Sequence, residues 1–200
     1  MSWAPPDDAR VAPSRDLRLA VAQIEAVRVA TPSLAEAARQ MIDLADCCED
    51  LAWRTARPGH LTGSAMVIDS SGEHVALLFH TKLRRWLQPG GHADGETNLA
   101  AVALREATEE TGIEGLVIDP SAVDLDIHRV APPAEDPHLH LDVRFVVAAP
   151  EGAVLQRNHE STELRWVRRD ELRRYDVDAG LVRLADAALE RFSALRRPRR

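Results

Sequence analysis

The sequence is poor in cysteine, aromatic residues and basic charge, and it lacks a long hydrophobic run. Its two cysteines, Cys47 and Cys48, are adjacent and badly placed to bond each other, so we expect no disulfide framework and a cytoplasmic location. Eight aromatic residues offer little surface on which nucleic-acid bases could stack, and the net charge of −7 does not attract a phosphate backbone. No apolar run approaches the roughly 20 residues of a membrane span. We expect neither nucleic acid nor a membrane as a partner.

The length and composition are those of a soluble globular protein. The chain has 200 residues, of which 45% are hydrophobic and 28% are charged. This is enough to bury the core of one domain of ordinary size, and it is too little for several. The sequence therefore predicts one domain, with room for an N-terminal extension.

Residues 1–57 are predicted to form that extension. Residues 1–13 contain three prolines and little periodicity, which is typical of a tail. Apolar residues then recur at helical spacing from Ser14 to Val27 and again from Leu34 towards Leu51. Ser33 and Glu36 have the spacing of a capping box for the second helix. The apolar helix faces could pack on the rest of the chain or could pair two copies, and we expect a homodimer.

Residues 58–200 show a mixture of strand and helix patterns. Strands are predicted over 61–68, 74–80, 123–130, 139–148 and 164–167, with a further short one at 86–87. Helices are predicted over 98–111, where Gly112 suits a left-handed cap, and over 179–195. The expected fold class is therefore α/β.

Three carboxylates mark the segment that carries chemistry. Glu106, Glu109 and Glu110 are spaced three and four residues apart, which places them on one face of the predicted helix. Like charges at this spacing repel one another, and a bound divalent cation would compensate for that repulsion. Oxygen ligands without cysteine or histidine favour Mg²⁺ or Mn²⁺ over zinc, and Mg²⁺ in turn favours a phosphate-containing substrate.

The segment Gly90–Ile113 resembles the Nudix box. That box reads Gly, five residues, Glu, seven residues, Arg-Glu, two residues of which the first is apolar, Glu-Glu, any residue, Gly and an apolar residue. Counted from Gly91, the matching positions are Arg105, Glu106, Ala107, Glu109, Glu110, Gly112 and Ile113. Thr97 stands where the box has its first Glu, and Glu96 lies one residue earlier. Either Glu96 substitutes for that carboxylate, or the carboxylate is dispensable.

The resemblance implies an α/β/α sandwich around a mixed sheet, in a domain that spans 58–200. It also implies Mg²⁺-dependent hydrolysis of a nucleoside diphosphate linked to another moiety. ADP-ribose or a nucleotide sugar is the favoured substrate, because the N-terminal extension and the late acidic loop resemble the branch of the family that acts on sugar diphosphates. A hydrolase that removes oxidised nucleoside triphosphates, and a Nudix-like module that senses nucleotides without cleaving them, remain alternatives.

The same resemblance implies roles for individual residues. Glu106, Glu109 and Glu110 would be metal ligands together with the carbonyl oxygen of Gly91, and Arg105 would orient a carboxylate. The base that takes a proton from the attacking water would be Glu110, or a carboxylate of the late loop. The loop candidates are Glu160 and, second to it, Glu163.

Other side chains are candidates for binding the substrate. Trp86 and Arg84 precede the glycine pair, where a ring could hold a base and a guanidinium a phosphate, although Trp86 could equally be a core residue. His138, His140 and Asp142 alternate along a predicted strand and so share a face. They could bind a metal, but we favour hydrogen bonding to substrate, with His140 as the candidate.

Overall fold

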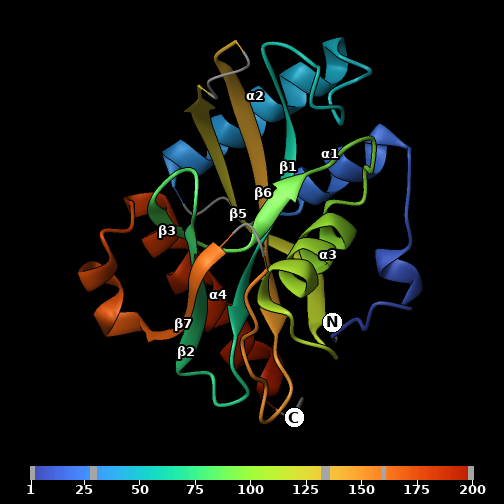
Figure 1. Ribbon diagram of the computed structural model, residues 1–200. Helices are drawn as coiled ribbons and strands as arrows, with labels where there is room; N and C mark the ends of the chain where they lie inside the picture. The colour runs from blue at the N-terminus through green and yellow to red at the C-terminus, as the bar shows by residue number, and fades with distance from the viewer. Residues whose placement is uncertain (1–2, 28–30, 132–135, 159–160, 198–200) are drawn as a thin grey trace.

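The computed structural model describes residues 3–27, 31–131, 136–158 and 161–197 (Figure 1). The helices are α1 (Leu17–Glu25), α2 (Pro32–Cys47), α3 (Leu99–Thr111) and α4 (Ala179–Arg196), with 3₁₀ turns η1 (Ala9–Val11) and η2 (Arg169–Tyr175). The strands are β1 (Gly59–Ile68), β2 (His74–His80), β3 (Arg85–Leu87), β4 (Gly90–His92), β5 (Val117–Val130), β6 (His138–Ala148) and β7 (Ser161–Arg168). None of these helices is long and apolar enough to cross a lipid bilayer.

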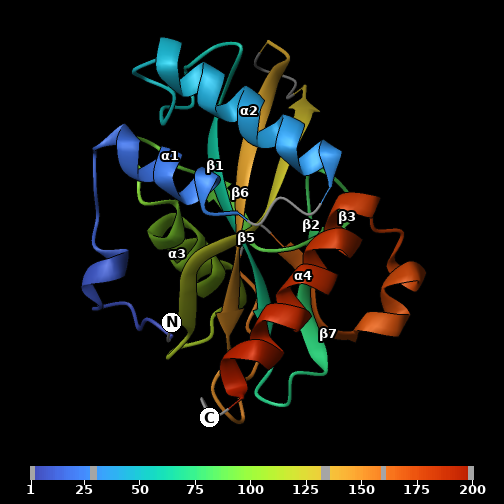
Figure 2. The ribbon, with the colours of Figure 1, turned by 180° about the vertical axis from the view of Figure 1, so that it is seen from behind.

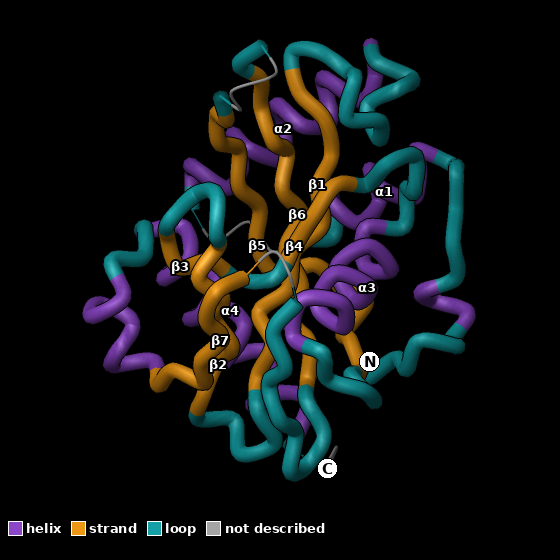
Figure 3. Tube along the Cα trace, in the orientation of Figure 1, coloured by secondary structure: helices purple, strands orange, loops and turns teal. Residues whose placement is uncertain are grey.

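The seven strands form one mixed sheet in the order β3-β2-β1-β6-β5, with β4 added beside β1 and β7 beside β2 (Figure 3). The parallel pair β1 and β6 lies in the middle and stays in register over its whole length, from Gly59 opposite Leu139 to Ile68 opposite Ala148. The other pairs are antiparallel. On its other side, β1 pairs with β4 near its start and meets β2 near its end.

Helices cover both faces of the sheet, which makes the α/β/α sandwich that was predicted. Figures 1 and 2 show α3 and α4 on opposite sides. One core cluster holds the buried residues of α1, α2 and α3 together with alternate residues of β1 and β6, such as Leu61 and Val143. The second cluster joins α4 to the intervening residues, such as Met66 and Val146. This division follows from the two-residue period of a strand.

The N-terminal helices pack on the rest of the chain. Ala20 and Ile24 of α1 and Leu34, Ala38 and Met41 of α2 are at most 8% exposed and belong to the first core cluster. Their apolar faces are thus covered within the protomer, which was one of the two arrangements expected for them.

The turn between β1 and β2 is built around one carboxylate. Asp69 accepts hydrogen bonds from the backbone N–H groups of Gly72, Glu73 and His74, and from the side chains of Ser71 and His74. Burial raises the pKa of the Asp69 carboxyl, but these hydrogen bonds outweigh burial and hold the pKa below its usual 3.8.

One local expectation was wrong. The N-cap of α2 is Thr31, whose side chain accepts from the N–H of Leu34, and Ser33 lies inside the helix because Pro32 occupies the first helical position. Cys47 of the same helix is exposed, because it lies off the face that carries Ala38 and Met41.

Candidate active site

The site is framed by β1, β4 and α3. Gly90, Gly91 and His92 of β4 pair with Ser64, Gly63 and Thr62 of β1. Helix α3 lies directly against β1, because a Cβ atom at Gly63 would be 2.8 Å from the carbonyl oxygen of Leu99. The close approach brings the carboxylates of α3 to the glycine pair of β4.

The glycine pair holds two of the three predicted carboxylates. The N–H of Gly90 donates to Oε2 of Glu110 at 2.9 Å, and Glu110 is only 5% exposed. A Cβ atom at Gly91 would lie 2.5 Å from Cδ of Glu106, so only glycine leaves room for that carboxylate. Glu106 and Glu110 therefore both lie against the glycine backbone.

Arg105 connects α3 to β4. Its Nη2 donates to Oε1 of Glu106 at 2.7 Å and to the carbonyl oxygen of His92 at 3.3 Å. Partial burial lowers the pKa of Arg105, but the carboxylates of Glu106, Glu109 and Asp94 more than offset this and raise it. Arg105 is thus hydrogen-bonded to both Glu106 and β4, and its role as the orienting residue stays a prediction.

Glu109 lies on the exposed side of this carboxylate group. Its charge acts on Arg105, which places it within the electrostatic reach of the site. Asp94, which the sequence did not single out, also acts on Arg105 through its charge. A salt bridge of 2.6 Å joins Asp94 to Arg54. The hydrogen bond from Arg54 lowers the pKa of Asp94.

The loop before α3 is held by Glu96. One oxygen of Glu96 accepts from the N–H of Asn98 at 2.7 Å and from the N–H of Ser14 at 2.8 Å. The N–H of Thr97 donates to the carbonyl oxygen of Ser14, while the buried Thr97 hydroxyl has no partner among the described residues. The side chain of Asn98 in turn donates to the carbonyl oxygens of Arg10 and Ala12. Glu96 therefore supports both the start of α3 and the N-terminal segment.

The opposite face of β1 carries a buried polar layer. The hydroxyls of Thr62 and Ser64 donate to Asp142 at 3.0 and 2.7 Å, and Nε of Arg144 donates to the same carboxylate at 2.7 Å. Arg144 also pairs with Asp124 and Asp126. Burial lowers the pKa of Arg144, but the three aspartates outweigh burial and raise it well above its ordinary value. Asp142 is thereby engaged within the protein.

The predicted substrate-binding residues do not lie together. Trp86 packs between Phe79 and Tyr175, with ring centroids 5.4 and 5.1 Å away. Arg84 is exposed and has a positive φ of 53°. His140 lies on β6, and in the sheet order β2 and β1 separate that strand from the strand of Trp86. Their roles in binding substrate stay predictions.

The late acidic loop is described only in part. Glu160 lies outside the described residues. Glu163 lies on β7, is exposed, and accepts a hydrogen bond of 2.7 Å from Arg165. The choice among Glu110, Glu160 and Glu163 as the base stays open.

The α/β/α sandwich is shared with solved structures of other proteins. Among solved structures, the chain is similar to a C. elegans Ap4A hydrolase in a binary complex, with 19% identity, 67% of this chain and 95% of that chain covered, and a TM-score of 0.52. A NUDIX family hydrolase from Clostridium perfringens is 21% identical, with 66% of this chain and 97% of that chain covered and a TM-score of 0.51. A Nudix hydrolase from M. smegmatis is 20% identical, with 70% of this chain and 90% of that chain covered and a TM-score of 0.51. These likenesses show the fold.

The NUDIX domain family matches residues 60–187, which is more than half of the chain. The chain therefore belongs to this family, and it is a hydrolase that acts on phosphorus-containing anhydrides. No curated protein matches it.

Proposed function

We propose that the protein is a Mg²⁺-dependent pyrophosphohydrolase that cleaves the diphosphate of a nucleoside diphosphate linked to another moiety. The observation that carries this proposal is the placement of the Glu106 carboxylate against Gly91 and of the Glu110 carboxylate against the N–H of Gly90. ADP-ribose and nucleotide sugars are the favoured substrates. The C. elegans neighbour is an Ap4A hydrolase, which adds dinucleotides to the substrates to be tested.

The residues present suit a hard divalent cation. The donor set consists of carboxylates, and the space beside Gly91 that a Cβ would fill holds the carboxylate of Glu106. Glu106, Glu109 and Glu110, with the carbonyl oxygen of Gly91, would hold Mg²⁺ or Mn²⁺. The cation would neutralise charge on the phosphoryl oxygens and lower the pKa of bound water.

The protein's own groups would complete the reaction. Arg105 keeps Glu106 oriented through their 2.7 Å hydrogen bond. Glu110, or Glu160 or Glu163 of the late loop, takes a proton as a water oxygen forms its bond to phosphorus. The bond between phosphorus and the bridging oxygen breaks, and the electron pair stays on the departing phosphate group. Trp86, Arg84 and His140 are proposed to contact the base, a phosphate and a hydroxyl of the substrate.

The location and the oligomeric state of the protein are also proposals. We place the protein in the cytoplasm, because its two cysteines are adjacent and are not expected to form a disulfide with each other. We also retain the homodimer, which the measured mass in solution would test. The apolar faces of α1 and α2 are covered within the protomer, so such a dimer would have to use another surface.

A panel of substrates tests the function. ADP-ribose, nucleotide sugars, dinucleotides and oxidised dGTP are each incubated with Mg²⁺ or Mn²⁺, and products are separated by chromatography. We expect cleavage of one group and a loss of at least about 100-fold in kcat for Glu110→Gln, and Glu163→Gln reports whether the second loop candidate supplies the base. Glu160→Gln reports whether the late loop supplies the base.

Other outcomes of the panel would change the assignment. Preferred cleavage of oxidised dGTP would make the protein a house-cleaning hydrolase. An absence of cleavage with either metal, together with a nucleotide that raises the melting temperature, would make it a nucleotide sensor in which Thr97 marks the altered box.

A further inference from the structure

Three histidines meet at the start of the central strand pair, and the ring of His92 from β4 lies 5.0 Å from that of His60 and 5.2 Å from that of His140. His60 of β1 lies opposite His140 in the parallel pair, and His138 precedes His140 by two residues on the same face of β6. Because neighbouring residues of a strand point to opposite faces, this face is opposite to that of Gly63, against which α3 packs. The histidine site, defined as His60, His138 and His140, is thus separated from the carboxylates of α3 by the sheet.

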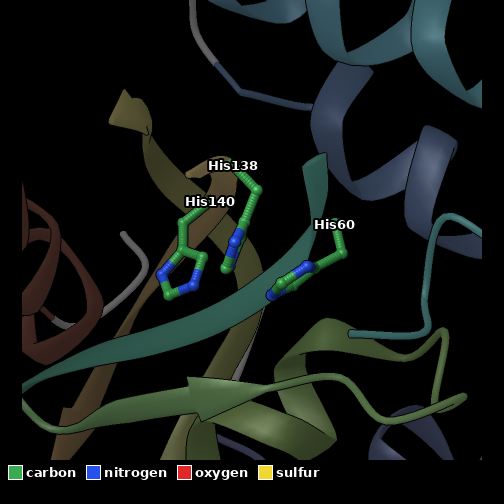
Figure 4. Close-up of side chains that lie close together, drawn as sticks. All are labelled: His60, His138 and His140. Carbon is green, nitrogen blue, oxygen red and sulfur yellow. The ribbon is translucent and has the colours of Figure 1, made fainter. Parts of the chain in front are cut away.

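The three rings point toward one another above β1 and β6 (Figure 4). The centroid of the His60 ring is 4.9 Å from those of His138 and His140, which are 5.5 Å apart. One nitrogen from each ring lies within 4.8 Å of the other two. Zn–N bonds of about 2.0–2.1 Å in a tetrahedron bring such nitrogens to about 3.4 Å. Each nitrogen would therefore move by roughly 1 Å or less.

The buried His60 side chain has unused ligand capacity. It is 1% exposed, and neither ring nitrogen has a hydrogen-bond partner among the described residues. Buried polar atoms are nearly always paired in native proteins, so an unpaired imidazole at the centre of the cluster points to a ligand. Burial, and then the neighbouring His92 and His138, lower the pKa of His60 to about 4, so its ring is neutral at pH 7 and offers a lone pair.

His138 is already oriented in the way that metal-binding histidines are. Its Nδ1 lies 2.8 Å from the carbonyl oxygen of Asp136, which can only accept, so Nδ1 carries the proton. The lone pair is then on Nε2. A histidine that ligates a metal usually donates its other N–H to a carbonyl or carboxylate in this manner.

We propose that His60, His138 and His140 bind one Zn²⁺ ion, at a site separate from the carboxylates of α3. Imidazole ligands favour zinc and neighbouring transition metals, whereas Mg²⁺ prefers oxygen. Three protein ligands leave one position of the tetrahedron for water or another oxygen ligand. In this assignment His140 serves a metal in place of the substrate hydrogen bond considered above. The inference does not depend on the proposed reaction.

Zinc binding to the full chain tests the site. The protein is stripped with a chelator and titrated with Zn²⁺ in the presence of excess Mg²⁺, and binding is followed by calorimetry and metal analysis. Co²⁺ is used as a second probe, because four-coordinate Co²⁺ gives intense visible bands. We expect one Zn²⁺ per chain, a higher melting temperature, and affinity reduced at least about 100-fold in His140→Gln and His138→Gln.

Two histidines outside the site provide matched controls. His128 is exposed, with its ring 5.3 Å from that of His140, and His74 lies at the start of β2 beside Asp69. His128→Gln and His74→Gln should keep the zinc affinity of the wild type. Equal losses in these controls would show diffuse binding to surface histidines and would overturn the proposal.

A crystallographic measurement keeps the proposal testable if a buried variant fails to fold. Crystals of the wild type grown with Zn²⁺ should show an anomalous peak among the three rings at the zinc absorption edge. The absence of that peak, or one-to-one zinc binding that survives in His138→Gln and His140→Gln, would refute the site.

Discussion

Gly91 is the position at which a single methyl group should separate activity from stability. In Gly91→Ala the new Cβ would lie 2.5 Å from Cδ of Glu106, whereas carbon atoms in contact are about 3.5–4.0 Å apart. The carboxylate must therefore move by about 1 Å. The atom that must move belongs to the carboxylate at the end of the partly exposed Glu106 side chain. Its rotation should cost about 1 kcal/mol of folding free energy or less.

The same displacement should be far more costly for the reaction. A misplacement of about 1 Å at a reacting centre reduces rates by roughly 100-fold, which corresponds to about 2.7 kcal/mol of transition-state stabilisation. Three measurements separate the effects: urea unfolding for stability, Mn²⁺ titration followed by electron paramagnetic resonance for metal affinity, and kcat/KM with the substrate found in the panel. We expect weaker metal binding and lower kcat/KM with nearly unchanged unfolding.

Gly152→Ala is the matched control. Gly152 has a positive φ of 76° and no atom within 4 Å of an added Cβ. Alanine there should cost about 1–2 kcal/mol through backbone strain and leave kcat/KM unchanged. If Gly91→Ala bound Mn²⁺ and turned over substrate like the wild type, the inference that glycine makes room for Glu106 would be refuted.

Three further predictions concern stability. Arg144→Met leaves buried aspartates without their cation and should cost about 3–5 kcal/mol in urea unfolding, whereas the exposed pairs lost in Arg39→Met are worth less than about 1 kcal/mol; similar costs would contradict this. The Asp69 carboxylate, with its folded pKa below 3.8, adds stability that is present above that pH and lost as the pH falls through the folded pKa. The stability difference between wild type and Asp69→Asn should therefore shrink on acidification, and a constant difference from pH 7 to about 2 would be inconsistent with this. Glu96→Gln should lower stability by about 1 kcal/mol in thermal unfolding, because it removes a charge at the N-terminus of α3, and an unchanged melting temperature would exclude that role.

Elements whose signals are local could be predicted from the sequence. The strand over 74–80 and the helix that ends at Gly112 were expected at nearly the observed residues, because turn residues bound the first and a left-handed glycine ends the second. The metal-ligand roles of Glu106 and Gly91 stay predictions, and the structure adds that the two residues are in contact. The assignment of the 58–200 domain boundary remains a prediction.

Features that depend on distant partners were beyond the sequence. The alternation of His138 and His140 was visible, but His60 joins them only through the parallel register of β1 with β6, about which periodicity says nothing. Strand β4 was missed because its glycines have little strand propensity and pair only through the fold. The exposure of Cys47 likewise depends on which face of α2 meets the sheet.

The contact between the N-terminal segment and the start of α3 has a consequence for synthesis. Arg10 and Ser14 are made 88 and 82 residues before Asn98 and Glu96, the residues that they meet. At about 5–20 residues per second, the early segment waits roughly 4–18 s on the ribosome for its partners. Nascent chains should therefore become resistant to protease near residues 10–14 only after α3 has emerged. The first residues synthesised are then among the later ones to form their native contacts.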